Sequence, residues 1–154
     1  MSGRRIADRR SDRRSEGRWA VLAEARRWIG TPYHHHARCR GVGVDCAQLL
    51  IAVYRAAGLI PDLDPGAYPV DWHLHRDEER YLGWVERYGH AVATAEPGDV
   101  AVYRFGRCYS HGGIVSGADT VIHAYLGLGC IETLASHPPL AGRPVRYYSL
   151  WGAA

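Results

Sequence analysis

Long apolar runs are missing from this sequence. No uninterrupted apolar stretch reaches the roughly 18 residues of a membrane-spanning helix, so we expect no membrane insertion. The arginine-rich N-terminus is not followed by an apolar segment, which predicts that there is no secretory signal peptide. We therefore expect synthesis in the cytoplasm, and a carrier would have to bring the protein to any extracellular substrate. Lysine is also absent, which we attribute to GC-rich coding rather than to function.

Cysteine is scarce, and its spacing excludes a disulfide-rich secreted scaffold. The four cysteines are Cys39, Cys46, Cys108 and Cys130. Their spacing includes no C-x-x-C motif and does not form the regular pattern of a disulfide framework. The simplest inference is a reducing compartment during synthesis. A disulfide among Cys39, Cys108 and Cys130 stays open at this point.

The net charge of +3 is unevenly distributed. Residues 1–18 hold seven of the nineteen arginines and three of the sixteen acidic residues, so the remainder is nearly neutral. Such an arm can contact nucleic acid or an anionic surface. Acidic residues are interspersed in it and apolar ones are few, so we predict a disordered arm over residues 1–18 and no nucleic-acid partner. Residues 19–154 are long enough to bury a core, and we predict a single domain.

Cys46 stands at the predicted start of a helix. Asp45 is suited to cap its N-terminus and Gly58 to close its C-terminus. Helical spacing of one buried face continues through Leu49, Leu50, Val53, Tyr54 and Ala57. A thiol in the first turn meets unpaired backbone N–H groups and the positive end of the helix dipole, which favour the thiolate. Taken alone, a small buried apolar residue is the commoner role of a free cysteine.

Two histidines further along the chain favour the nucleophile. His111 and His123 each lie in a short β-branched segment typical of a strand, and a turn at Gly117-Ala118-Asp119 separates the two segments. Such a hairpin presents both imidazoles on one face of a sheet. A thiolate, a facing imidazole and a second group that orients it form a nucleophile, base and orienter triad. We expect Cys46 and His111 to form a thiolate and imidazolium pair.

The order of the predicted elements indicates the fold class. Helical patterns come first, at Trp19–Ile29, from Cys46 to Gly58, and from Asp71 to Tyr88. Short strand patterns follow, at Val100–Phe105, Gly113–Ser116, Val121–Ala124, Gly129–Thr133 and Pro144–Leu150. This order predicts an α+β domain with N-terminal helices packed on a central antiparallel sheet. The first helix is expected to bury an apolar stripe of Trp19, Val21, Leu22, Ala25, Trp28 and Ile29.

Other histidines are weaker candidates for a functional site. The loop Tyr33–Gly43 carries His34, His35, His36 and Cys39, which suggest a zinc site. Consecutive residues rarely converge on one ion, so we predict a polar loop lining a cleft, with no metal and no other cofactor. Trp72 and His73 could line a groove at the start of the third helix, although packing in a core or cap is the commoner role.

Five motifs resemble those of the NlpC/P60 cysteine peptidases, in the same order and context. They are Trp28-Ile29-Gly30-Thr31-Pro32-Tyr33, Gly43-Val44-Asp45-Cys46, Glu96-Pro97-Gly98-Asp99-Val100, Ser110-His111-Gly112-Gly113-Ile114-Val115 and Val121-Ile122-His123-Ala124. The resemblance extends over roughly residues 19–150. It implies a papain-like α+β fold and cleavage of an amide bond in the stem peptide of bacterial peptidoglycan, between D-glutamate, through its γ-carboxyl, and a diamino acid.

The resemblance also implies roles for particular residues. Cys46 would be the nucleophile, His111 the general base and then acid, and His123 the residue that orients His111. Tyr33 and Asp45, beside the nucleophile, would serve the substrate or the oxyanion. One departure is the pair Ala47-Gln48, where the family usually has Ser-Gly.

Within the family, two segments look most like the stand-alone peptidases of phage tails and gene transfer agents. These are Gly41 to Cys46 and Pro69 to Tyr81, which includes Asp71-Trp72-His73. That likeness implies tail proteins as partners and delivery to the cell wall as part of a particle. Two alternatives stay open. One is an antibacterial effector amidase of the same fold, and the other is a non-catalytic tail-assembly protein.

Overall fold

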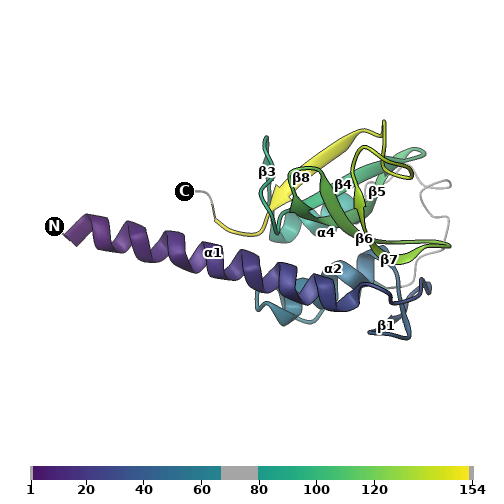
Figure 1. The fold of residues 1–154 in the computed structure, drawn as a ribbon, viewed down its shortest axis with the longest axis horizontal. Helices are drawn as coiled ribbons and strands as arrows, with labels where there is room; N and C mark the ends of the chain where they lie inside the picture. The colour runs from purple at the N-terminus through teal and green to yellow at the C-terminus, as the bar shows by residue number, and fades with distance from the viewer. Residues whose placement is uncertain (1, 67–79, 153–154) are drawn as a thin grey trace.

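The computed structural model describes residues 2–66 and 80–152 (Figure 1). Its helices are α1 (Ser2–Trp28), α2 (Cys46–Ala56) and α4 (Arg80–Tyr88). Its strands are β1 (Arg38–Cys39), β2 (Gly43–Val44), β3 (His90–Val92), β4 (Val100–Phe105), β5 (Cys108–Gly117), β6 (Thr120–Tyr125), β7 (Gly129–Leu134) and β8 (Val145–Ser149). β1 pairs with β2, and the other six strands form an antiparallel sheet in the order β3-β8-β4-β5-β6-β7. The predicted α+β class is confirmed.

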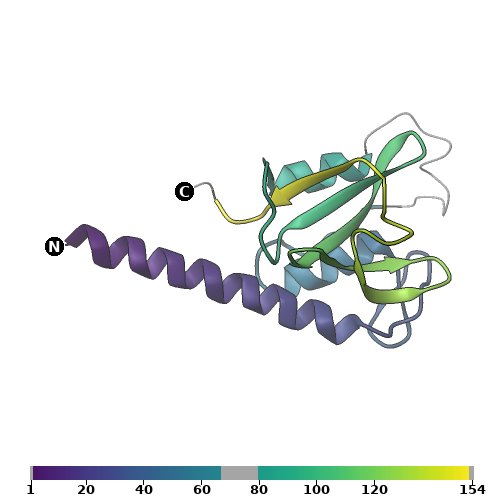
Figure 2. The same cartoon turned by 45° about the horizontal axis from the view of Figure 1, so that its top comes forward.

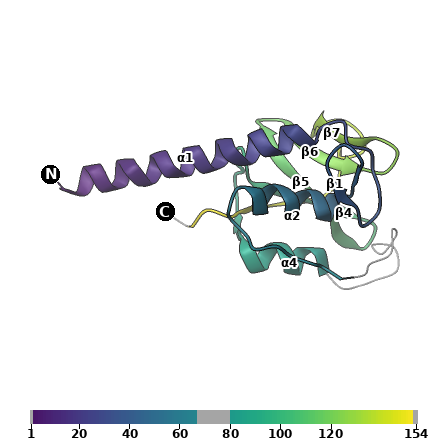
Figure 3. The same cartoon turned by 90° about the horizontal axis from the view of Figure 1, so that it is seen from below.

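The helices cover one face of the six-stranded sheet. Figure 3 shows α2 lying between α1 and α4. Side chains alternate along β4, so that Val100 and Val102 enter the main core under the helices while Ala101, Tyr103 and Phe105 enter a smaller cluster. The main core also contains Val21, Ala25, Leu49, Val53, Tyr54, Ile114 and Ile122. The main core therefore fixes α2, which begins at Cys46, against β5.

The predicted strands are confirmed, with shifts of one residue at several ends and of five residues at the start of β5. β4 has the predicted bounds, and β5 begins at Cys108 instead of Gly113, so that His111 lies inside a strand. β3 was not predicted, because it is three residues long and carries mostly exposed side chains.

The predicted disordered arm is corrected, because α1 begins at Ser2 and includes residues 2–18. Figures 1 and 2 show this part of the helix extending away from the body. Arginine, alanine and glutamate favour helices, and no proline interrupts the segment. Arg18 ties the helix down, with its Nη1 2.9 Å from Asp99 Oδ1, its Nη2 3.0 Å from Glu96 Oε2, and its guanidinium over the Trp151 ring. The division between residues 1–18 and a domain over 19–154 stays a prediction.

The buried stripe of α1 is narrower than predicted. Val21, Leu22, Ala25 and Trp28 are buried, whereas Trp19 is 68% exposed and Ile29 is 43% exposed. Trp19 precedes Val21 by two positions, which turns it to the far side of the helix. Ile29 follows the last helical residue. No helix in the described part of the chain is long and apolar enough to cross a membrane.

The two ends of α2 agree with the prediction. Asp45 has an extended backbone, and its Oδ1 accepts the N–H of Gln48 at 2.8 Å. Gly58 follows the helix with a φ of +76°, and its N–H bonds to the carbonyl of Arg55. Cys46 is therefore the first helical residue.

The third predicted helix is described only in its second half, as α4. It ends at Tyr88, as predicted, and buries Tyr81 and Leu82. Trp72 and His73, predicted to line a groove, lie outside the described residues.

Candidate active site

The Cys46 side chain meets the backbone of β5 on both sides of His111. Its Sγ lies 3.9 Å from the carbonyl oxygen of Ser110, and the N–H of Gly112 also bonds to the sulfur. The register of β5 with β6 begins only at Ile114, so the preceding residues of β5 turn an open edge toward α2. The start of α2 occupies this edge and brings the thiol beside His111.

Two glycines after His111 allow this close packing. A Cβ on Gly112 would overlap the hydroxyl of Tyr81 and would lie 2.8 Å from Cδ1 of Leu50. A Cβ on Gly113 would lie 2.5 Å from Cγ1 of Val121. Glycine is therefore needed at both positions if α2, α4 and β6 are to approach β5.

The two predicted histidines are in direct contact. Nε2 of His111 lies 2.8 Å from Nδ1 of His123, and the His123 side chain is fully buried. Burial lowers the pKa of His123 to about 4, so this imidazole is neutral at ordinary pH. A neutral His123 can accept the Nε2–H of His111 at Nδ1, which leaves His111 Nδ1 for proton transfer. The hairpin thus brings His111 and His123 together as the sequence predicted.

Aromatic rings enclose His111. Its ring centroid lies 5.0 Å from that of Phe105 and 5.5 Å from that of Tyr125. Sequence reasoning did not select either residue, because aromatic side chains in strands are most simply explained as core. The rings of Phe105 and Tyr125 limit the orientations that the His111 imidazole can take.

Burial of Cys46 opposes the predicted thiolate. Burial, and then the Asp45 carboxylate, raise the pKa of the Cys46 thiol to about 12. Hydrogen bonds from the Gly112 N–H, the Tyr81 hydroxyl and the Ala47 N–H act in the opposite direction but do not outweigh burial. Burial thus favours the neutral thiol at Cys46.

Tyr33 lies near the thiol, and Asp45 immediately precedes it. The Tyr33 backbone bridges to Val44, and burial followed by the charges of Cys46 and Asp45 raises the pKa of its hydroxyl. Tyr33 therefore stays a neutral donor. Asp45 is 2% exposed and accepts N–H groups from Gln48 and His36, each at 2.8 Å, so it holds the preceding loop against α2. Direct contact of either side chain with a substrate stays a prediction.

Tyr81 is a site residue that sequence reasoning did not select. Its hydroxyl donates to the carbonyl of Cys46 at 3.3 Å and bonds to the thiol as well. The sequence placed Tyr81 on the inward face of a helix, where a tyrosine is most simply a core residue. A buried hydroxyl needs a partner, which is the only signal that pointed to a polar role.

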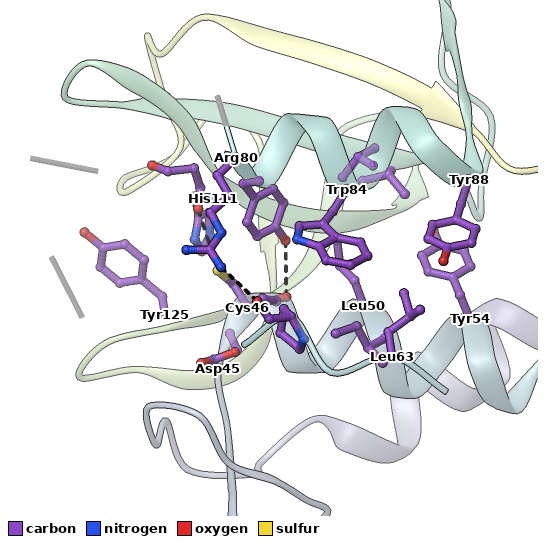
Figure 4. Close-up of a pocket in the computed structure, with 18 of the residues that line it drawn as sticks. Asp45, Cys46, Leu50, Tyr54, Leu63, Arg80, Trp84, Tyr88, His111 and Tyr125 are labelled. Carbon is purple, nitrogen blue, oxygen red and sulfur yellow. Dashed lines mark hydrogen bonds between the residues drawn. The ribbon is translucent and has the colours of Figure 1, made fainter. Parts of the chain in front are cut away.

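These residues surround a cavity of about 240 Å³ between the sheet, α2 and α4 (Figure 4). Asp45, Cys46, His111 and Tyr125 lie at one end, and Tyr54 and Tyr88 lie at the other. Leu50, Leu63 and Trp84 line the space between the ends. The reactive thiol thus opens into a cavity with a largely apolar wall.

The other cysteines and histidines form no second centre in the described part of the chain. None of the four cysteines, all in the described part of the chain, forms a disulfide. Among residues 2–66 and 80–152, no group of three or more His, Cys, Asp or Glu is arranged to hold a metal ion. His35 instead faces Asp45, with 3.9 Å between its Nδ1 and Asp45 Oδ2. It also lines the cavity, as expected for the loop.

Solved structures that resemble this chain include NlpC/P60 proteins. The NlpC/P60 domain of the peptidoglycan hydrolase SagA has a TM-score of 0.58 and 23% sequence identity, over 84% of this chain and 96% of that chain. The chain has the NlpC/P60 fold. NlpC1 from Trichomonas vaginalis gives a TM-score of 0.61 at 17% identity, over 86% of this chain and 43% of that protein. A protein of the NLP/P60 family from Staphylococcus aureus, described as similar to a lipoprotein, has a TM-score of 0.58 and 18% sequence identity. The match covers 85% of this chain and 41% of that chain.

This likeness is one of structure. The chain spans nearly the whole SagA domain but less than half of the other two proteins. No protein-family model matches the sequence, and neither does a curated protein. The NlpC/P60 fold nevertheless agrees with the architecture expected from the five motifs.

Proposed function

We propose that this protein is a cysteine peptidase that hydrolyses an amide bond in the stem peptide of bacterial peptidoglycan. The observation that carries the proposal is the arrangement of Cys46, His111 and His123, with the thiol at the start of α2 and the two imidazoles 2.8 Å apart. The fold shared with the domain of a peptidoglycan hydrolase supports the substrate class. The preferred bond is the γ-D-glutamyl bond to the diamino acid, as the motif resemblance implies.

The neutral thiol defines the first step of the proposed reaction. Nδ1 of His111 takes the thiol proton as Sγ attacks the amide carbonyl, and His123 accepts the Nε2–H of the resulting imidazolium. The backbone N–H of Cys46 and the hydroxyl of Tyr33 donate to the oxyanion, each contributing about 3 kcal/mol in comparable sites. His111 then protonates the leaving amine, which releases it and leaves an acyl group on sulfur. Water, deprotonated by His111, hydrolyses this thioester.

We further propose that the protein acts at the cell wall as part of a phage-tail or gene-transfer-agent particle. The support is the likeness of Gly41 to Cys46 and of Pro69 to Tyr81 to the peptidases of such particles. Mass spectrometry of purified particles from the source cells tests this proposal. The protein should co-purify with tail proteins, and its absence from them would favour an effector.

The reaction is tested by digesting purified Gram-negative peptidoglycan and its soluble muropeptides under reducing conditions. Mass spectrometry should detect a new stem-peptide fragment with the wild type and none with Cys46→Ala, and the fragment mass names the bond. Cys39→Ala is the matched control, because Cys39 is an exposed thiol outside the cavity lining. Release by Cys46→Ala would contradict the role of Cys46 as nucleophile. No release by the wild type across pH would contradict the proposal and favour a non-catalytic tail component or an effector.

A further inference from the structure

Arg80 lies at the reactive end of the cavity. It is the first residue of α4 and precedes Tyr81, whose hydroxyl bonds to the Cys46 carbonyl. Arg80 lines the same cavity as Cys46, and Figure 4 draws it at the end where Asp45, Cys46 and His111 lie. The wall of the cavity into which the Cys46 thiol opens therefore includes a guanidinium.

The two described charged residues that line the cavity are not paired with each other. Among the described residues that line it, Arg80 is the one arginine or lysine and Asp45 the one acidic residue. Asp45 already accepts the N–H groups of His36 and Gln48. Nη2 of Arg80 donates to the backbone carbonyl of Pro65 at 3.1 Å, and no described Asp or Glu lies within ion-pair distance of it. The cavity thus carries a cation whose recorded partner is a neutral carbonyl.

An anionic group of the substrate would supply the missing partner. A guanidinium presents five N–H donors in a planar fork, and among the described residues Arg80 uses one of them, in the hydrogen bond to Pro65. The apolar walls formed by Leu50 and Trp84 lower the local polarity, which strengthens a charge-assisted hydrogen bond. The geometry of this fork matches a carboxylate better than a neutral amide.

We propose that Arg80 determines specificity by binding a free carboxylate adjacent to the scissile amide. This inference rests on the proposed function. An acidic residue linked through its γ-carboxyl keeps its α-carboxylate free beside the bond, so it has the required chemistry. The same residue with its α-carboxyl amidated loses the charge but keeps the shape. The enzyme should therefore discriminate between amidated and non-amidated stem peptides.

The test compares two synthetic peptides. One is L-Ala-γ-D-Glu-diaminopimelate, and the other is the same peptide with the α-carboxylate of D-Glu converted to a carboxamide. The wild type should show at least about a tenfold higher kcat/KM for the carboxylate peptide. Arg80→Gln should lower kcat/KM for that peptide about tenfold to a hundredfold and change the carboxamide rate little. Arg80→Lys should lie between the two, because it keeps a point charge without the fork. Arg55→Gln is the matched control, since it removes an exposed charge of α2 outside the cavity lining.

Binding separates this inference from the reaction itself. Calorimetry with Cys46→Ala measures the affinity of both peptides, and the doubly substituted Cys46→Ala, Arg80→Gln protein should lose the preference for the carboxylate. An equal preference with and without Arg80, in variants with comparable thermal midpoints, overturns the inference. If the wild type cleaves neither peptide, the proposed reaction fails, while the two binding constants still decide the role of Arg80.

Discussion

The cavity has two unlike walls. The strand wall includes His111 on β5, whose imidazole contacts that of the fully buried His123 on β6 inside the packed sheet. The helix wall is formed by Arg80, Tyr81 and Trp84 on α4, and its polar groups bond to backbone carbonyls of other segments, Pro65 and Cys46. The strand wall is therefore fixed by the register of a hairpin, whereas the helix wall depends on how α4 lies on the sheet.

This difference separates chemistry from selection. The strand wall holds a neutral acceptor behind a base, which is what proton transfer requires. The helix wall holds a guanidinium, a hydroxyl and an indole, which can distinguish one acyl donor from another. We therefore expect substitutions in the strand wall to act mainly on kcat and those in the helix wall to act more on the choice of substrate.

The largest effect is expected for His111→Ala. Without a base, the Cys46 thiol keeps its proton, because its pKa is about 12, and kcat/KM for the stem peptide should fall at least about a thousandfold. His90→Ala, which removes an exposed histidine of β3, should leave the rate unchanged. The measurement is the initial rate of peptide release, with circular dichroism to verify folding. Retained activity in a folded His111→Ala protein would show that His111 is not the catalytic base.

The next largest effect is expected at His123. His123→Ala should lower kcat about a hundredfold, because the Nε2–H of His111 loses its acceptor. His123→Asn offers an amide oxygen and should keep about a tenth of the wild-type rate. Steady-state kinetics of the two variants give the comparison. Equal rates for alanine and asparagine would argue that His123 only fills space.

The strand wall could be predicted from the sequence because its information is local. His111 and His123 lie in neighbouring strands separated by a tight turn, so the period of two and the turn residues already place both imidazoles on one face. Asp45 likewise caps the helix that follows it directly. Each of these inferences needs only neighbours along the chain.

The helix wall could not be predicted, because its roles depend on contacts between distant segments. Tyr81 and Trp84 have the spacing of an ordinary amphipathic helix, and only packing on β5 brings the Tyr81 hydroxyl to Cys46. The burial that raises the thiol pKa was not predicted for a related reason. The helix terminus is visible in the sequence, whereas the burial that outweighs it comes from the whole cavity.

The protonation state of Cys46 can be measured by alkylation. Since its pKa is about 12, the thiolate fraction should rise about tenfold per pH unit from pH 7 to 10, and carbamidomethylation by iodoacetamide should rise with it. Mass spectrometry of the Cys46 peptide gives the rate, and exposed Cys39 in the same samples shows that the reagent is active. A rate independent of pH over this range would show that Cys46 is already a thiolate at pH 7, paired with the imidazolium of His111.

The smallest effect is expected for Tyr81→Phe, which connects the two walls. The ring that packs over Gly112 is kept, so the free energy of unfolding should change by about 1 kcal/mol or less. The lost hydroxyl bonded to the Cys46 carbonyl and helped to lower the thiol pKa, so kcat and the alkylation rate should both fall a few-fold. Tyr88→Phe is the control, because Tyr88 lines the far end of the cavity. If Tyr81→Phe changed only the preference between the carboxylate and carboxamide peptides, Tyr81 would act with Arg80 in selection. A fall in kcat with the preference unchanged would mean that the helix wall also sets the reactivity of the thiol.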